Sequence, residues 1–127
     1  MSRFLWICLG GAAGTGARYL LTGWALAWLG PGFPWGTLAV NTLGSFAIGA
    51  IMHLALATRM MGPTLRLTLT TGVLGGFTTY SAFNYETLQY LRESNWGIGL
   101  ANVAATVLLC LAAGVAGLGL ARWLAGA

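Results

Sequence analysis

Charged side chains are scarce in this 127-residue chain: they make up 6% of it, against about 25% in a typical soluble domain. There are six arginines but no lysine, and two glutamates but no aspartate. So few ionised groups cannot cover the surface of a globular domain in water. The arginines are scattered, so the net charge of +4 does not indicate a nucleic-acid surface. The composition excludes a soluble enzyme, a disordered chain and a nucleic-acid-binding protein.

Histidine, acids and cysteine are also too rare for most site chemistry. The single histidine is His53, and the carboxylates Glu86 and Glu93 are seven residues apart. A metal centre needs three or four ligands, and a catalytic acid pair needs two neighbouring carboxylates. We therefore predict that the chain is not an enzyme. Cys8 and Cys110 lie inside apolar runs, and we interpret both as small core residues rather than as a disulfide.

Apolar sequence is abundant: hydrophobic residues make up 57% of the chain, and its mean hydropathy is +0.78. A transmembrane helix needs about 20 mostly apolar residues. Four stretches meet this length, at about 4–29, 35–57, 65–91 and 96–123. Short loops make consecutive helices antiparallel neighbours. The sequence predicts one all-α integral membrane domain over residues 1–127.

Small residues recur four positions apart in three of these stretches. Such spacing lets membrane helices approach closely. The pairs are Gly10/Gly14, Ser45/Gly49 and Ala113/Gly117. Together they predict a tight bundle.

The third stretch differs from a plain span because polar residues and Gly75-Gly76 lie near its middle. Adjacent glycines are poor helix formers, and non-helical backbone at membrane depth is tolerated only where it is buried or lines a cavity. We predict a helix broken near 75–79 whose freed backbone groups bind a ligand of unspecified kind. The alternative is that the glycines mark a close-packing point in a continuous helix.

Several polar residues in the other spans allow two interpretations each. Arg18 is either a snorkelling helix-end residue or a source of positive potential at the mouth of an anion path. Asn41 is an interhelical hydrogen-bonding residue or a pathway ligand. Glu86 is an interfacial acid or part of a hydrogen-bond network at a vestibule. His53, close to the end of the second span, is interpreted as an interface residue.

Two further patterns follow helical spacing. Asn102, Thr106 and Cys110 form one polar stripe on the fourth span, which by itself favours helix packing. Tyr80 and Phe83 share a helix face, as an ordinary aromatic pair would.

Three segments taken together resemble the Fluc (CrcB) family of fluoride channels. They are Gly10-Gly11-Ala12-Ala13-Gly14 with Arg18-Tyr19, Pro34-Trp35-Gly36-Thr37-Leu38-Ala39-Val40-Asn41, and Thr71 to Phe83 with Glu86 after it. The resemblance covers essentially the whole chain, and the third-span motif is highly specific.

The resemblance implies an antiparallel, dual-topology homodimer in the inner (plasma) membrane with two fluoride pores. It implies a structural Na⁺ at the dimer centre, held by the backbone carbonyls of Gly75 and Thr78. Such a channel exports fluoride passively and gives fluoride resistance. The implied pore residues are Asn41, Thr79, Tyr80, Ser81 and Phe83, and the implied vestibule residues are Arg18 and Glu86.

The sequence departs from the family pattern after the double threonine. Tyr80 stands where the family usually has phenylalanine, and Ala82 and Asn84 replace hydroxyl-bearing residues. The helix therefore carries fewer hydroxyls than the family pattern, so we do not carry the family's conduction rate and selectivity against chloride over to this chain.

The alternative function is a small four-helix, proton-coupled multidrug transporter. Such carriers use a carboxylate buried in the first helix, whereas the first span here has Arg18 and no acid. The arginines also give a modest orientation bias, which dual topology does not predict. In a four-span subunit one side holds Arg3, Arg59, Arg66 and Arg122, and the other holds Arg92 and Arg18.

Overall fold

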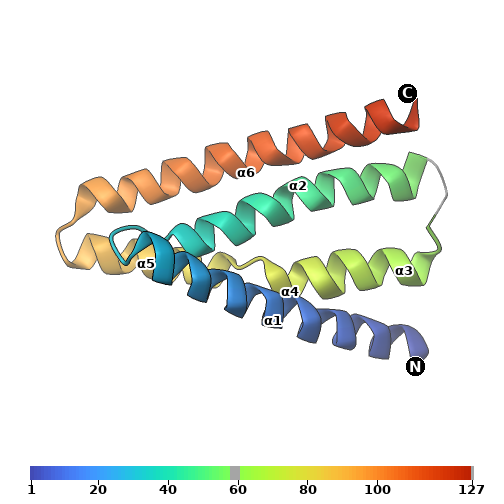
Figure 1. Cartoon of the computed structure of the whole chain (residues 1–127), viewed down its shortest axis with the longest axis horizontal. Helices are drawn as coiled ribbons and strands as arrows, with labels where there is room; N and C mark the ends of the chain where they lie inside the picture. Colours follow the sequence, from blue (N-terminus) through green and yellow to red (C-terminus); the bar gives the residue numbers. More distant parts are fainter. Residues whose placement is uncertain (58–60, 127) are drawn as a thin grey trace.

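The computed structural model describes residues 1–57 and 61–126, and all of its regular structure there is helical, as predicted. The elements form four rods, the third of which is broken (Figure 1). In chain order they are α1 Ser2–Leu29, α2 Trp35–Ala57, α3 Pro63–Leu67, the π-helix η1 Thr68–Leu74, α4 Gly75–Phe77, α5 Tyr80–Arg92 and α6 Trp96–Ala125.

Among the described residues, two helices are long and apolar enough to cross a membrane. They are Trp35–Leu56 of α2 and Trp96–Ala125 of α6. The 28 residues of α1 are long enough at 1.5 Å per residue, but they include Arg3 and Arg18. The third predicted span is divided into shorter pieces, so no single helix of it reaches that length.

The helices pack as two close pairs: α2 lies against α6, and α1 lies against η1 and α4. Small residues make both contacts possible. A Cβ atom added to Gly14 would overlap the Val73 carbonyl, and one on Gly117 would overlap the Phe46 carbonyl. Gly10 and Gly49 meet neighbouring backbone in the same way. The predicted small-residue pairs therefore lie at helix contacts.

The distribution of polarity is the reverse of that in a water-soluble domain. Few apolar side chains are buried, whereas large ones such as Trp28 and Val115 are 89% and 70% exposed. The buried polar residues are Thr37, Asn41, Thr79, Thr87, Asn102 and Thr106. An apolar exterior around a hydrogen-bonded polar interior suits lipid as the surrounding solvent.

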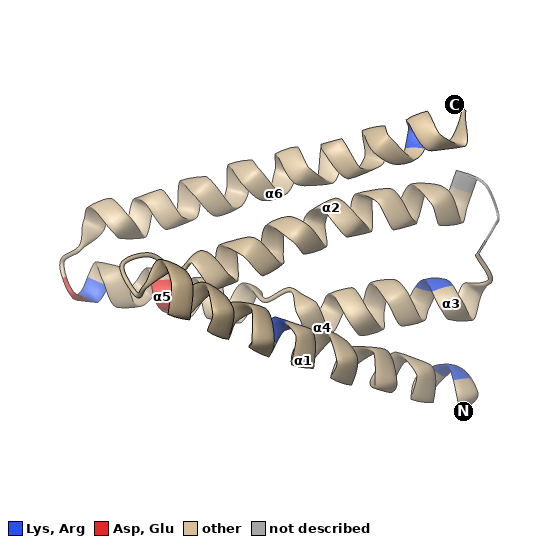
Figure 2. Ribbon diagram, viewed as in Figure 1, with Lys and Arg blue, Asp and Glu red and all other residues tan. Residues whose placement is uncertain are grey.

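Charged residues lie mainly near the two ends of the bundle, apart from a basic band within α1 and an acidic band in α5 (Figure 2). The arginines of α3 and of the outer turns of α1 and α6 share the end where both termini lie. Arg3 there donates from Nε to Thr64 Oγ1 at 3.4 Å. Arg59, predicted for the same side, lies outside the described residues.

The prediction of two core cysteines is wrong for one of them. Cys110 is half-buried on α6, but Cys8 is exposed on α1. The prediction failed because an apolar run does not identify the core in this fold, where outward faces are apolar as well.

Candidate functional site

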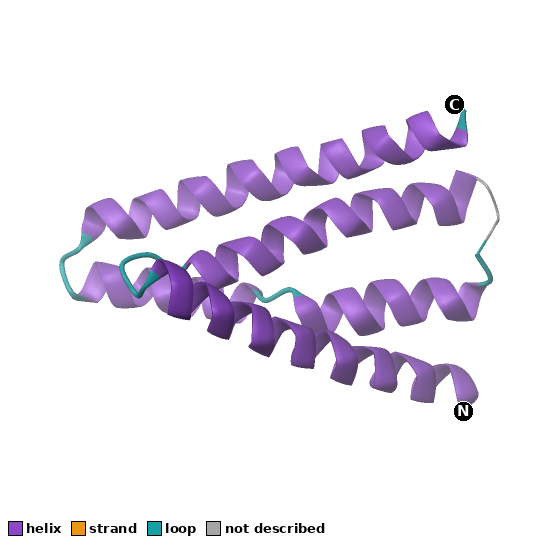
Figure 3. Ribbon diagram, viewed as in Figure 1, coloured by secondary structure: helices purple, strands orange, loops and turns teal. Residues whose placement is uncertain are grey.

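The third rod is broken at Thr78 and Thr79, between α4 and α5 (Figure 3). Both residues have extended backbone, with φ/ψ of −82°/158° and −152°/114°. This falls within the predicted 75–79 interval but at its far end. Gly75 has helical angles of −63°/−35°, and Gly76 also lies in α4.

The glycine pair is a close-packing point rather than the cause of the break. A Cβ atom on Gly76 would overlap the Gly11 carbonyl and come within 3.0 Å of Thr15. The alternative interpretation is therefore correct in that Gly76 is a close-packing point and wrong in expecting a continuous helix, because the rod breaks at Thr78 and Thr79.

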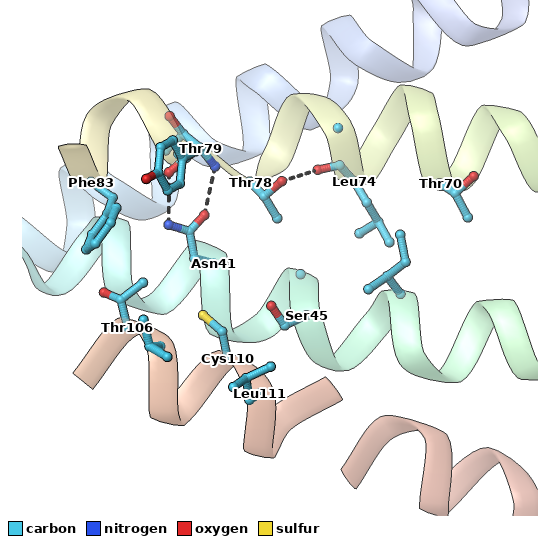
Figure 4. A pocket seen from close by; sticks show the side chains of 15 residues that line it. Asn41, Ser45, Thr70, Leu74, Thr78, Thr79, Phe83, Thr106, Cys110 and Leu111 are labelled. Atoms are coloured by element: carbon cyan, nitrogen blue, oxygen red, sulfur yellow. Dashed lines mark hydrogen bonds between the residues drawn. The ribbon is translucent and has the colours of Figure 1, made fainter. Parts of the chain in front are cut away.

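Asn41 on α2 holds the broken segment by pairing with the backbone of Thr79 (Figure 4). The Asn41 Nδ2 donates to the Thr79 carbonyl at 2.9 Å, and the Thr79 N–H donates to Asn41 Oδ1 at 2.7 Å. Asn41 and Thr79 are 8% and 7% exposed, so this pair is buried. One side-chain amide thus replaces the helical partners that an extended residue loses.

Thr79 also caps the second half of the rod. Its Oγ1 accepts from the N–H of Ala82 at 3.2 Å, as an N-cap threonine does, and lies 3.2 Å from Ser81 Oγ. The preceding Thr78 hydroxyl donates back to the Leu74 carbonyl at 2.9 Å.

These contacts release two backbone carbonyls. In a continuous α-helix the N–H of Thr79 would donate to Gly75, and that of Ala82 to Thr78. Here those N–H groups donate to Asn41 and to the Thr79 hydroxyl instead. The carbonyls of Gly75 and Thr78 therefore lose their helical donors at mid-rod.

An open groove of about 530 Å³ runs beside the break, with walls from α2, the third rod and α6 (Figure 4). Asn41, Thr79, Tyr80 and Phe83 all contribute to its lining. The rings of Tyr80 and Phe83 have centroids 5.5 Å apart and are tilted by 53°, as their predicted shared face requires. Phe83 is buried, whereas Tyr80 is 77% exposed.

Other predicted residues border this groove. Thr106 and Cys110 line its α6 wall, and Cys110 Sγ lies 3.9 Å from Thr42 Oγ1. Ser81, which follows Tyr80 in the sequence, is exposed and does not contribute to the lining. A second groove of about 800 Å³ continues along α2 and α6 and is lined in part by His53, whose Nε2 is buried without a hydrogen-bond partner within the described chain.

Glu86 belongs to a different cavity, of about 430 Å³, near the connection between α1 and α2. Thr37 donates to its Oε1 at 2.6 Å, while Oε2 is buried without a partner among the described residues. Arg18 is half-buried on α1, and its guanidinium makes no hydrogen bond within the described part of the chain. The two predicted vestibule residues are therefore not paired with each other in one subunit.

Sequence reasoning missed two threonines that organise the site. Thr37 holds Glu86, and Thr87 accepts a hydrogen bond from Asn102. Each stands four residues from a predicted site residue on its own helix: Thr37 from Asn41, and Thr87 from Phe83. That spacing places them on the same face and was the available signal.

A family model described as "CrcB-like protein, Camphor Resistance (CrcB)" matches residues 5–118. Curated relatives align over nearly the full length of both chains, and each is named a fluoride-specific ion channel FluC. The one from Sorangium cellulosum is 56% identical over 96% of this chain and 96% of its own. The relative from Anaeromyxobacter dehalogenans is 54% identical over 99% of this chain and 100% of its own. The relative from Geobacter sulfurreducens is 51% identical over 98% of this chain and 100% of its own.

Proposed function

This chain belongs to the CrcB family, and from that membership we propose that it is a passive, fluoride-selective channel. The family is one of ion channels and not of enzymes. The observation that carries the proposal is the groove at the helix break, where a buried amide and two aromatic rings meet at mid-membrane.

The groove offers the groups that a small, strongly hydrated anion needs. The Asn41 amide has two N–H bonds, of which one is given to Thr79, so the other can donate to fluoride. The rings of Tyr80 and Phe83 have positive edges that an anion can approach. Thr79 also lines the groove, and its hydroxyl lies 3.2 Å from that of Ser81. The lining contains no carboxylate that would repel the ion.

A second, antiparallel copy of the chain would close this groove. The groove lies open along one side of the subunit, and its walls are mostly apolar, which suits a protein partner within lipid. Two copies related by a two-fold axis would enclose two equivalent pores. In this arrangement the polar residues around Thr79 are shielded from the hydrocarbon.

The released carbonyls of Gly75 and Thr78 support the proposed structural Na⁺ at the dimer centre. Oxygen ligands suit a hard cation, and freed backbone carbonyls at a helix break serve this purpose in membrane proteins. Gly75 is exposed on the subunit, as a position facing a partner copy would be. The Thr78 side chain is engaged with Leu74, so its backbone oxygen is the available ligand.

Passive flow is sufficient for export across the inner membrane. An inside-negative potential drives an anion outward with about 2.3 kcal/mol per 100 mV. Arg18 and the Thr37–Glu86 pair lie outside the central groove, where they would act as vestibule groups on the way to it. A fixed positive charge there raises the local concentration of the anion.

Ion flux from purified protein in liposomes tests the proposal. Vesicles loaded with potassium fluoride should release fluoride when valinomycin carries the compensating potassium, and vesicles loaded with chloride should not. Chloride release as fast as fluoride release would overturn the selectivity, and no release of either ion would overturn the channel function.

A further inference from the structure

Three hydrogen bonds connect the α6 wall of the groove to the backbone of Phe83. Thr106 Oγ1 donates to Asn102 Oδ1 at 3.4 Å, and Asn102 Nδ2 donates to Thr87 Oγ1 at 3.0 Å. Thr87 Oγ1 in turn donates to the Phe83 carbonyl at 2.8 Å. All donors point the same way along this chain of bonds, from α6 to α5.

Asn102, at the centre of this chain of bonds, lies behind the groove rather than in it. Its side chain is 0% exposed, and neither Asn102 nor Thr87 contributes to the groove lining. Thr106 and Phe83, at the two ends, do line it (Figure 4). Asn102 therefore cannot touch an ion in the groove, yet it is hydrogen-bonded to Thr106, which lines the groove, and through Thr87 to the carbonyl of Phe83, which also lines it.

The short helix α5 needs such a restraint, because the rotation of α5 about its axis sets where the Phe83 ring points. The Asn41–Thr79 pair holds the N-terminal end of α5, and Thr37–Glu86 holds it further along. Thr87 is one turn beyond Phe83 and on the same face. Its bond to Asn102 fixes that face against α6.

We propose that Asn102 is a positioning residue that, through Thr87, fixes the orientation of the Phe83 ring and thereby sets fluoride selectivity. The proposal rests on the proposed function, since Phe83 matters for selectivity only if it lines the fluoride path. Asn102 is 0% exposed, and burying its amide without hydrogen-bond partners would cost free energy, so these partners are needed for it to be buried. Of the two hydrogen bonds of the Asn102 amide, the shorter, at 3.0 Å against 3.4 Å, is the one to Thr87, and Thr87 is the residue that bonds to Phe83.

The test compares variants on both sides of the link in the liposome assay. Asn102→Leu removes the amide at similar size, and Thr87→Val removes the hydroxyl that receives its bond. Each is expected to lower the fluoride-to-chloride flux ratio about tenfold, and the double variant should be no worse than either single one, since both break the same link. Thr87→Ser keeps the hydroxyl and should give a flux ratio at least about fivefold above that of Thr87→Val.

A spectroscopic readout separates this proposal from the proposed function. With 4-fluorophenylalanine at position 83, the ¹⁹F resonance should move in the same direction in Asn102→Leu and Thr87→Val, and less in Thr87→Ser. If the wild-type chain shows no fluoride flux, the proposed function fails, but the ¹⁹F shift still tests whether Asn102 and Thr87 set the position of the Phe83 ring. An unchanged resonance in Thr87→Val, or additive losses in the double variant, would overturn the positioning role. If Asn102→Leu does not fold, the two Thr87 variants decide the question.

Discussion

Asn41 and Thr79 pair as two residues of a β-ladder do, although one partner contributes its side chain: the amide both donates to and accepts from the same backbone residue. The two residues are 38 positions apart. Because this pair satisfies the backbone at the point where the helix stops, it stabilises the break as well as bordering the groove.

Replacing Asn41 should therefore destabilise the fold. Asn41→Leu leaves a buried N–H and a buried carbonyl of Thr79 without partners, which is expected to cost about 2–4 kcal/mol of unfolding free energy. Titration with SDS in mixed micelles measures this. Among the described residues, the hydroxyl of the neighbouring Thr42 has one possible hydrogen-bond partner, Cys110 Sγ at 3.9 Å, so Thr42→Val is the control and should change little. Equal stability of the two variants would contradict the role of the pair.

A substitution at Tyr80 distinguishes an ion contact made by its ring edge from one made by its hydroxyl. Tyr80→Phe removes only the hydroxyl; if the ring edge faces the ion, as we expect, fluoride flux should change little. A hydroxyl that donates to fluoride would be worth roughly 1.5–3 kcal/mol, so its removal would alter the apparent affinity about tenfold or more. Fluoride efflux measured across a concentration series distinguishes the two outcomes.

Phe83→Ile should abolish most fluoride flux, because an aliphatic side chain has no positive ring edge. Phe83 is buried and faces the groove, so the variant must first be shown to fold by its thermal transition. Wild-type efflux from a folded Phe83→Ile protein would remove the aromatic residues from the proposed pore, whatever Tyr80→Phe does.

Gly44 and Thr78 are in close contact at the break, so a smaller residue at position 78 should compensate for a larger one at position 44. A Cβ atom on Gly44 would overlap the Thr78 methyl group, so Gly44→Ala should displace the Thr78 backbone and impair function severely. Thr78→Ser removes that methyl but keeps the hydroxyl that donates to Leu74, and it should be mild. The double variant should recover much of the lost flux. Failure of Thr78→Ser to improve Gly44→Ala would show that the contact is not limiting.

Two glycines on α1 test the close approach of α1 to the third rod. Gly14→Ala would overlap the Val73 carbonyl and is expected to destabilise the protein by more than about 2 kcal/mol, since backbone must move. Gly16 has nothing within 4 Å of an added Cβ atom, so Gly16→Ala should be neutral or slightly stabilising. Thermal unfolding in one detergent compares the two directly.

The all-helical fold was predictable because its main determinants are local. Apolar runs, short loops and small residues four apart indicated the bundle, and Gly14 and Gly117 lie at contacts of that kind. Cys8 was misplaced because hydropathy alone does not distinguish a lipid-facing side from an interior one.

The site was predictable in part. The glycines drew attention to the right interval, but the exact position of the break depends on Asn41, a residue on another helix. The Thr37–Glu86 and Asn102–Thr87 bonds also join separate helices, so no local pattern could specify them. The roles of the groove residues in ion passage and the Na⁺ site stay predictions.

The two close helix pairs described above, α2 with α6 and α1 with η1 and α4, have a consequence for genetics. Each pair packs closely at glycines that contact neighbouring backbone, whereas the side-chain bonds Thr37–Glu86 and Asn102–Thr87 join α5 to the α2–α6 pair. Mutations inside a pair should yield alleles with no accumulated protein. Under the proposed function, mutations of Thr37 or Thr87, which make these bonds, should yield protein that accumulates normally but gives altered resistance to fluoride. A screen that scores protein abundance and survival separately should sort variants into these two classes by their place in the fold.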